Sequence, residues 1–119
     1  MIIGFIGLGN LGEKLAATLL RNGLDLIIHD KFKEIASKLI IAGAKWEDKP
    51  IELTKKSDII ITCLPSPRIC AQVMESEIGV IKGFSAGKIW LEMSTTSKSE
   101  VLRISKLVSE IGGYSADCP

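Results

Sequence analysis

The 119-residue sequence is poor in metal-binding and cross-linking residues, with one histidine and three cysteines. The single histidine and the lack of a Cys-x-x-Cys pair argue against a zinc site, which needs several Cys or His ligands. The odd number of cysteines, which are Cys63, Cys70 and Cys118, argues against a disulfide framework and favours a reducing compartment. We therefore expect no metal and a cytoplasmic location.

An excess of charge of either sign and a long apolar run are also absent. The 15 basic and 14 acidic residues nearly cancel and the lysines are scattered, so we expect neither a nucleic acid nor a membrane as partner. No apolar segment is long enough to span a bilayer, and the apolar N-terminus lacks the basic region of a signal peptide. The length and the 46% hydrophobic content predict one soluble domain over residues 1–119.

Glycine, by contrast, is abundant, and three glycines form a motif near the N-terminus. The segment Gly7-Leu8-Gly9-Asn10-Leu11-Gly12 follows an apolar strand and opens a helix with apolar residues at helical spacing. Gly7 permits a tight turn, Gly9 lets the backbone approach a pyrophosphate, and Gly12 allows close helix packing. Free N–H groups and the helix dipole would then bind the pyrophosphate. All six residues are predicted cofactor contacts; the alternative is a turn that binds no ligand.

An acidic residue follows the next strand at the spacing expected for ribose binding. The strand over residues 26–29 ends at Asp30, about 20 positions past the glycine loop. A carboxylate there accepts hydrogen bonds from the ribose hydroxyls and repels a 2′-phosphate, which favours NAD over NADP. Lys31 offers a phosphate one point charge rather than a bidentate fork, so NADP stays open. Asp30 and Lys31 are both predicted to contact the cofactor.

Strands and helices alternate along the whole chain. Strands are predicted over 1–6, 26–29, 44–46, 58–64, 88–92 and 114–118, and helices over 10–22, 35–40, 50–56, 66–75 and 97–111, with a helical turn near 78–81. This alternation predicts an α/β fold, a Rossmann-type doubly wound parallel sheet.

Ligands of such sheets bind at the carboxyl ends of the strands. The glycine loop, Asp30, Leu64-Pro65-Ser66 and Ser94-Thr95-Thr96 all follow predicted strands, so we expect them to face one crevice. Thr95 is predicted to contact the cofactor on this ground, although it is also compatible with an ordinary loop hydroxyl. The lone His29 lies inside a strand without a catalytic partner, which favours a structural or adenosine-adjacent role.

Four segments resemble the β-hydroxyacid dehydrogenases, a family that includes 3-hydroxyisobutyrate dehydrogenase, tartronate semialdehyde reductase and, more distantly, 6-phosphogluconate dehydrogenase. The segments are residues 4–12, Thr62-Cys63-Leu64-Pro65, Met93-Ser94-Thr95-Thr96 and Asp117-Cys118-Pro119, in the order that the family has them. Residues 26–32 are most similar to the 3-hydroxyisobutyrate branch. The resemblance implies that Leu64 and Pro65 contact the cofactor, Ser94 the substrate and Thr95 the nicotinamide side.

The chain departs from the family pattern at three places. Glu92 replaces an aspartate and Lys98 replaces a proline, and neither change removes a contact group. In the family, a substrate loop, a helix with the catalytic lysine, further strands and a helical domain follow the Asp-x-Pro segment, and residues 1–119 contain none of them. The resemblance thus implies an N-terminal NAD-binding domain, C-terminally truncated, with no catalytic residue of its own and no activity alone.

The reaction implied for the intact enzyme is the reversible oxidation of a small 3-hydroxy acid to its semialdehyde, with NAD as hydride acceptor. The family also implies a homo-oligomer, formed largely through its helical domain. Two other interpretations stay open. One is a related imine- or pyrroline-type reductase. The other is a non-catalytic NAD-sensing Rossmann module, which would not account for the Leu-Pro and Ser-Thr-Thr segments.

Overall fold

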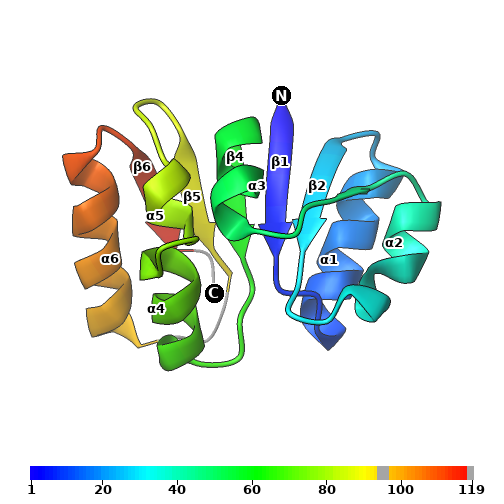
Figure 1. Ribbon diagram of the computed structural model, residues 1–119, viewed down its shortest axis with the longest axis horizontal. Helices are drawn as coiled ribbons and strands as arrows, with labels where there is room; N and C mark the ends of the chain where they lie inside the picture. The colour runs from blue at the N-terminus through cyan, green and yellow to red at the C-terminus, as the bar shows by residue number, and fades with distance from the viewer. Residues whose placement is uncertain (94–96, 118–119) are drawn as a thin grey trace.

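The computed structural model describes residues 1–93 and 97–117, which form one six-stranded parallel sheet with helices on both faces (Figure 1). The strand order is β3-β2-β1-β4-β5-β6, and each neighbouring pair is parallel. The strands are β1 (Ile2–Ile6), β2 (Asp25–His29), β3 (Lys45–Trp46), β4 (Ile59–Thr62), β5 (Ile89–Glu92) and β6 (Tyr114–Asp117). The predicted fold class is confirmed.

The strand order reverses between β1 and β4, the two central strands. The chain first builds outward from β1 to β3 and then returns to β4, which pairs with the other side of β1. The loops that leave the carboxyl ends of β1 and β4 therefore run in opposite directions and open a crevice between them, where ligands of this architecture bind.

Two layers of helices cover the sheet (Figure 1). On one face lie α1 (Asn10–Arg21), the 3-10 turn η1 (Lys33–Ala36) and α2 (Ser37–Ile41). On the other face lie α3 (Pro50–Lys56), α4 (Pro67–Glu75), α5 (Val80–Gly83) and α6 (Lys98–Glu110). Each face encloses an apolar cluster, one around Phe5 and Ile28 and the other around Trp90 and Ile60. Burial of each such side chain contributes about 1.5–3 kcal/mol.

Local signals place three of the helix starts where the sequence predicts them. Pro50 opens α3, where a missing N–H costs no hydrogen bond. The Ser66 and Ser97 hydroxyls cap α4 and α6 by accepting hydrogen bonds from the Ile69 and Glu100 amides, both at 3.2 Å. The single helix expected over 35–40 is wrong in one respect. The segment begins as η1, because the Ile35 amide bonds the Phe32 carbonyl three residues back.

An ion-pair cluster joins α4 to α6. The Arg103 guanidinium donates from Nη1 and Nη2 to the two Glu75 carboxylate oxygens, each at 2.6 Å, and from Nε to Glu100 Oε2 at 2.9 Å. Its hydrogen bonds and charge lower the pKa of both glutamates below their usual values. All three side chains are partly exposed, so the effect on stability is screened by solvent.

Replacement of Arg103 by methionine is expected to weaken the pH dependence of stability. A carboxyl group whose pKa is lowered by folding stabilises the protein above its unfolded-state pKa, and this contribution is lost as pH falls through the folded-state value. The wild type should therefore lose more stability than Arg103→Met as pH falls below 4.5, the ordinary value of these groups. Urea unfolding between pH 7 and pH 3 measures the difference. Lys106→Met, an exposed change on the same helix, is the control, and equal pH profiles for all three proteins would contradict the prediction.

Candidate functional site

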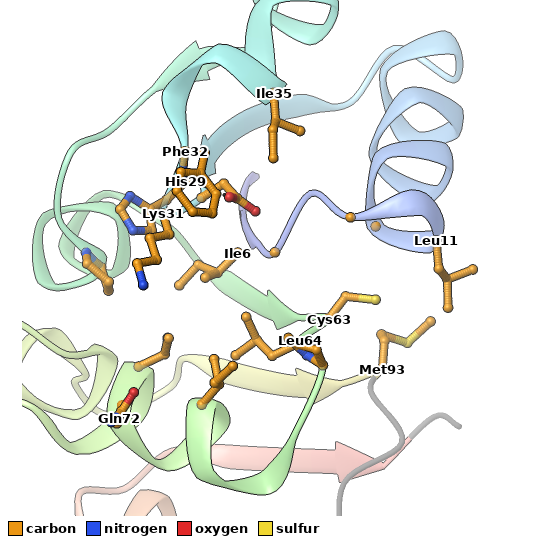
Figure 2. Close-up of a pocket in the computed structure, with 18 of the residues that line it drawn as sticks. Ile6, Leu11, His29, Lys31, Phe32, Ile35, Cys63, Leu64, Gln72 and Met93 are labelled. Carbon is orange, nitrogen blue, oxygen red and sulfur yellow. Dashed lines mark hydrogen bonds between the residues drawn. The ribbon is translucent and has the colours of Figure 1, made fainter.

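A groove of about 1070 Å³ lies at the carboxyl ends of β1, β2, β4 and β5 (Figure 2). The start of α1 and the loop after β2 form one wall, and α4 forms the other. The lining residues are Ile6, Gly7, Gly9–Gly12, His29–Phe32, Ile35, Asp48, Pro50, Cys63–Pro65, Ile69, Gln72, Val73, Ser76, Ile78 and Met93. The structure thus brings together the glycine loop, Asp30 and Leu64-Pro65, although Leu8 and Ser66 of the expected groups do not line the groove. Residues 94–96 lie outside the described residues.

The three loop glycines differ in what a side chain would meet. Gly7 has a φ of +103°, a conformation that favours glycine, and a Cβ there would collide with the Cys63 carbonyl oxygen. A Cβ on Gly12 would collide with the Gly7 carbonyl oxygen. A Cβ on Gly9 has no atom within 4 Å, because this residue faces the open groove. Gly7 and Gly12 are therefore required by the fold, and Gly9 is free for a ligand to approach.

The first turn of α1 presents backbone donors to the groove. Gly9 is the N-cap residue, and among the described residues no side chain caps this end. The Glu13 amide closes the first helical turn on the Gly9 carbonyl at 2.8 Å. The amides of the intervening residues 10–12 precede that first helical hydrogen bond and lie at the positive end of the helix dipole. This arrangement suits an anion such as a pyrophosphate.

Asp30 is held in place by two backbone amides. Its Oδ2 accepts a hydrogen bond from the Leu8 amide at 2.7 Å, and its Oδ1 accepts one from the Phe32 amide at 3.0 Å. Each carboxylate oxygen has a further lone pair, so both can also accept from ribose hydroxyls. Leu8 itself is only 1% exposed and packs in the core. Its predicted cofactor contact can therefore come only from its backbone, which also orients Asp30.

Lys31 brings a positive charge into the groove beside this carboxylate. Its side chain extends into the groove in Figure 2, and its Nζ lies 5.7 Å from the centre of the Phe32 ring. A lysine over an aromatic ring is attracted by the negative face of that ring. The groove therefore carries a negative group that disfavours a 2′-phosphate and, next to it, a positive group that attracts one.

The end of β4 supplies the opposite wall. Cys63, Leu64 and Pro65 line the groove, and the N-cap Ser66 then starts α4. Burial and the nearby Glu92 carboxylate raise the pKa of the Cys63 thiol, so it is a poor nucleophile at neutral pH. The predicted substrate contact Ser94 and the predicted nicotinamide contact Thr95 lie outside the described residues, and both assignments stay predictions.

A buried polar network supports this wall from beneath. The Glu92 side chain is 0% exposed, and its Oε2 accepts hydrogen bonds from the Thr62 hydroxyl at 2.9 Å and the Cys70 thiol at 3.2 Å. The Trp90 indole in turn donates to Thr62 Oγ1 at 2.9 Å. Thr62 and Glu92 end β4 and β5, one residue before Cys63 and Met93 in the groove. Cys70, which the sequence does not single out, therefore ties α4 to both strands.

Truncation of Glu92 is expected to destabilise the protein strongly. Glu92→Ala leaves a cavity and removes the acceptor of two buried donors, which together cost about 2–4 kcal/mol of unfolding free energy. Glu92→Gln keeps the shape and one acceptor oxygen, so we expect a loss of about 1 kcal/mol. Urea unfolding measures both values. The exposed Glu110→Ala is the control, and equal stability of Glu92→Ala and this control would contradict the prediction.

Several groove residues carry no signal in a residue-by-residue inspection of the sequence. Ile69, Gln72 and Val73 line the groove from α4, and Ser76, the residue that follows α4, also lines it. Their i, i+3, i+4, i+7 spacing defines one helical face, so a search for the face directed at the glycine loop could have found them. Asp48 carries no such signal, whereas Met93 directly follows the strand predicted over 88–92 and belongs to one of the four family segments.

Within residues 1–93 and 97–117, no group of three or more His, Cys, Asp or Glu residues is placed to hold a metal ion. No helix in the described part of the chain is long and apolar enough to cross a membrane.

A parallel sheet with a glycine turn, an uncapped helix start and an oriented carboxylate after the second strand defines the NAD-binding Rossmann domains. The family model for the NAD binding domain of 6-phosphogluconate dehydrogenase matches residues 2–119, and the chain belongs to this family.

The chain is similar to a hydroxyacid dehydrogenase in sequence and to imine reductases in structure. It is 33% identical over 117 residues to mitochondrial 3-hydroxyisobutyrate dehydrogenase of Mus musculus, a match that covers 98% of this chain and 35% of the mouse protein. The solved structure of an imine reductase from Pseudomonas sp. is 29% identical with a TM-score of 0.88, over 98% of this chain and 40% of that one. An imine reductase from Myxococcus stipitatus in complex with NADP+ shares the fold, with 20% identity, a TM-score of 0.89, and coverage of 98% and 40%. The chain thus spans well under half the length of these proteins.

Proposed function

We propose that this chain is the cofactor-binding part of an NAD-dependent 3-hydroxyacid dehydrogenase that transfers hydride between NAD and a small 3-hydroxy acid. One observation carries the cofactor assignment: the Asp30 carboxylate is held by the Leu8 amide, so the predicted ribose contact and the glycine loop form one unit. The substrate class is supported by the identity of one third to a 3-hydroxyisobutyrate dehydrogenase over nearly the whole chain.

The groove residues fit an extended dinucleotide. Gly9 leaves open space for the pyrophosphate, since no atom lies within 4 Å of a Cβ built there. The amides of residues 10–12 would hold its oxygens, and Asp30 would hold the adjacent ribose. Leu64 and Pro65 would lie along the cofactor and exclude water from that wall.

These residues bind and orient, and none of them moves a proton or hydride in the proposed reaction. When bound, NAD would supply the hydride acceptor for the carbon that carries the substrate hydroxyl. Ser94 is proposed to hold the substrate, and Thr95 the nicotinamide side. No lysine of this chain is assigned to acid–base catalysis, so we expect negligible turnover by the chain alone. Robust NAD reduction with 3-hydroxyisobutyrate in a steady-state assay would contradict this.

Calorimetric titration with NADH and, separately, NADPH tests the cofactor assignment. We expect NADH to bind at least about tenfold more tightly, because a 2′-phosphate beside Asp30 places like charges together. Tighter binding of NADPH would show that Lys31 outweighs Asp30. Failure of both to bind would contradict the proposed function.

An imine reductase is the second candidate, favoured by the solved structure with 29% identity and a TM-score of 0.88. The two functions share the dinucleotide groove and differ in substrate. In an enzyme that contains this chain together with its substrate domain, oxidation of 3-hydroxyisobutyrate would support the first proposal. Reduction of a cyclic imine without that oxidation would support the second.

The compartment and the assembly stay predictions. The cysteine content favours the cytoplasm, whereas the mouse relative is a mitochondrial protein. We propose a homo-oligomer for the intact enzyme, formed outside residues 1–119, and sedimentation of the intact enzyme would test it.

A further inference from the structure

His29 is the last residue of β2 and lines the groove directly before Asp30 (Figure 2). Its Nδ1 lies 2.8 Å from the Glu47 carbonyl oxygen. A carbonyl oxygen only accepts hydrogen bonds, so this contact assigns the proton of the imidazole to Nδ1. The Trp46 ring packs beside the imidazole, with ring centres 5.5 Å apart, and helps to hold its orientation.

This contact determines whether the other ring nitrogen, Nε2, donates or accepts a hydrogen bond. In a neutral imidazole with its proton on Nδ1, Nε2 carries a lone pair and is a hydrogen-bond acceptor. The two nitrogens point in roughly opposite directions. Glu47 follows the edge strand β3, so Nδ1 faces that edge, and His29 itself lines the groove. We therefore expect Nε2, on the other side of the ring, to face the groove.

The neighbours of His29 make this end of the groove polar. Lys31 lies beside it, and Gln72 faces the groove from α4, whereas Leu11 and Met93 lie at the other end (Figure 2). The Gln72 amide can both donate and accept. A purine base, whose edge carries donors and acceptors, fits such a set better than a wholly apolar ligand does.

We infer that His29 Nε2 accepts a hydrogen bond from the exocyclic amino group of adenine and makes the groove selective for adenine over 6-oxopurines. The inference rests on the proposed function, in which Asp30 holds the ribose that carries this base. His29 directly precedes Asp30, so the base lies within its reach. A 6-oxopurine places a carbonyl lone pair opposite the Nε2 lone pair, and the hydrogen bond is lost.

The test compares NADH with reduced nicotinamide hypoxanthine dinucleotide, which differs at this position of the base. In calorimetric titrations, the wild type should bind the hypoxanthine analogue about tenfold more weakly, the effect of one lost buried hydrogen bond. His29→Asn keeps an N–H donor for the Glu47 carbonyl, but its shorter side chain places no acceptor at the position of Nε2. We expect it to bind the two dinucleotides within about twofold of each other.

Lys33→Met is the matched control, because the Lys33 Nζ lies 5.8 Å from the centre of the Trp46 ring but Lys33 does not line the groove. This variant should keep the tenfold preference of the wild type for NADH. Equal binding of both dinucleotides by the wild type would overturn the inference and leave the proposed function intact. If folded His29→Asn still binds NADH about tenfold more tightly than the hypoxanthine analogue, the inference is also overturned and the proposed function is unaffected. Failure of the wild type to bind either dinucleotide would overturn both. The comparison of the two dinucleotides on the wild type needs no variant, so it tests the preference for adenine even if His29→Asn does not fold.

Discussion

Replacement of Gly7 by alanine is expected to destabilise the protein and abolish NADH binding, whereas Gly9→Ala should abolish binding alone. At Gly7 the new Cβ meets the Cys63 carbonyl in a backbone conformation with a φ of +103°. Collision and backbone strain together should cost about 3 kcal/mol or more of unfolding free energy. At Gly9 no atom lies within 4 Å and φ is −66°, so stability should stay within about 0.5 kcal/mol of the wild type.

Urea unfolding and NADH calorimetry of the two variants separate these effects. We expect Gly9→Ala to lose NADH affinity by roughly 100-fold or more, because its Cβ occupies the space of the pyrophosphate. Gly23→Ala is the control for backbone strain, since Gly23 has a φ of +79° with no atom within 4 Å of a Cβ. It should cost about 1–2 kcal/mol without any loss of NADH affinity. Wild-type NADH affinity in Gly9→Ala would show that the loop is only a turn.

Asp30→Ala is expected to weaken NADH binding by about 100-fold without a gain in NADPH affinity. Loss of two charge-assisted hydrogen bonds to the ribose costs about 3 kcal/mol, which corresponds to that factor. The Leu8 amide also loses its acceptor, so the glycine loop that holds the pyrophosphate becomes less well ordered. The poorer order of the loop weakens the binding of both cofactors. It therefore offsets the affinity that NADPH would gain when the repulsion between Asp30 and its 2′-phosphate is removed.

Hydrogen exchange of the Leu8 amide in the free protein tests this double role directly. The amide should exchange faster in Asp30→Ala than in the wild type, because its 2.7 Å hydrogen bond is gone. Asp48→Ala is the matched control: Asp48 also lines the groove, but its carboxylate accepts from the Trp46 indole at 2.6 Å. A large gain in NADPH affinity with unchanged Leu8 exchange would indicate that Asp30 acts on the ribose alone.

Local patterns in the sequence were sufficient for the order and type of the main elements. The cap residues Ser66 and Ser97 act within a few residues of the chain, and the glycine loop and Asp30 are recognisable from residue type and spacing alone. The continuous apolar run of β4 marks a strand covered on both faces, which implies a central position in a parallel sheet. These features predict the Rossmann architecture and the location of the groove.

The partners of individual side chains could not be predicted in the same way. Glu92 was notable in the sequence only as a replacement for aspartate, yet the structure buries it completely against Thr62 and Cys70. The contact joins residues 22 and 30 positions apart, and it forms only when β4, β5 and α4 have packed. The bond between the Nδ1 of His29 and the Glu47 carbonyl depends in the same way on the pairing of β2 with β3.

By itself, the sequence determined the α/β class, the positions of the helices and strands, and the candidate cofactor residues of the glycine loop and Asp30. Those properties follow from hydrophobic periodicity, turn-forming residues and short-range spacing, which are local. Only the tertiary structure decided that the Leu8 amide orients Asp30, that α4 forms the facing wall, and that Nδ1 of His29 contacts the Glu47 carbonyl. These properties depend on hydrogen-bond geometry between segments that are distant in the chain, and packing of the sheet is what brings those segments together.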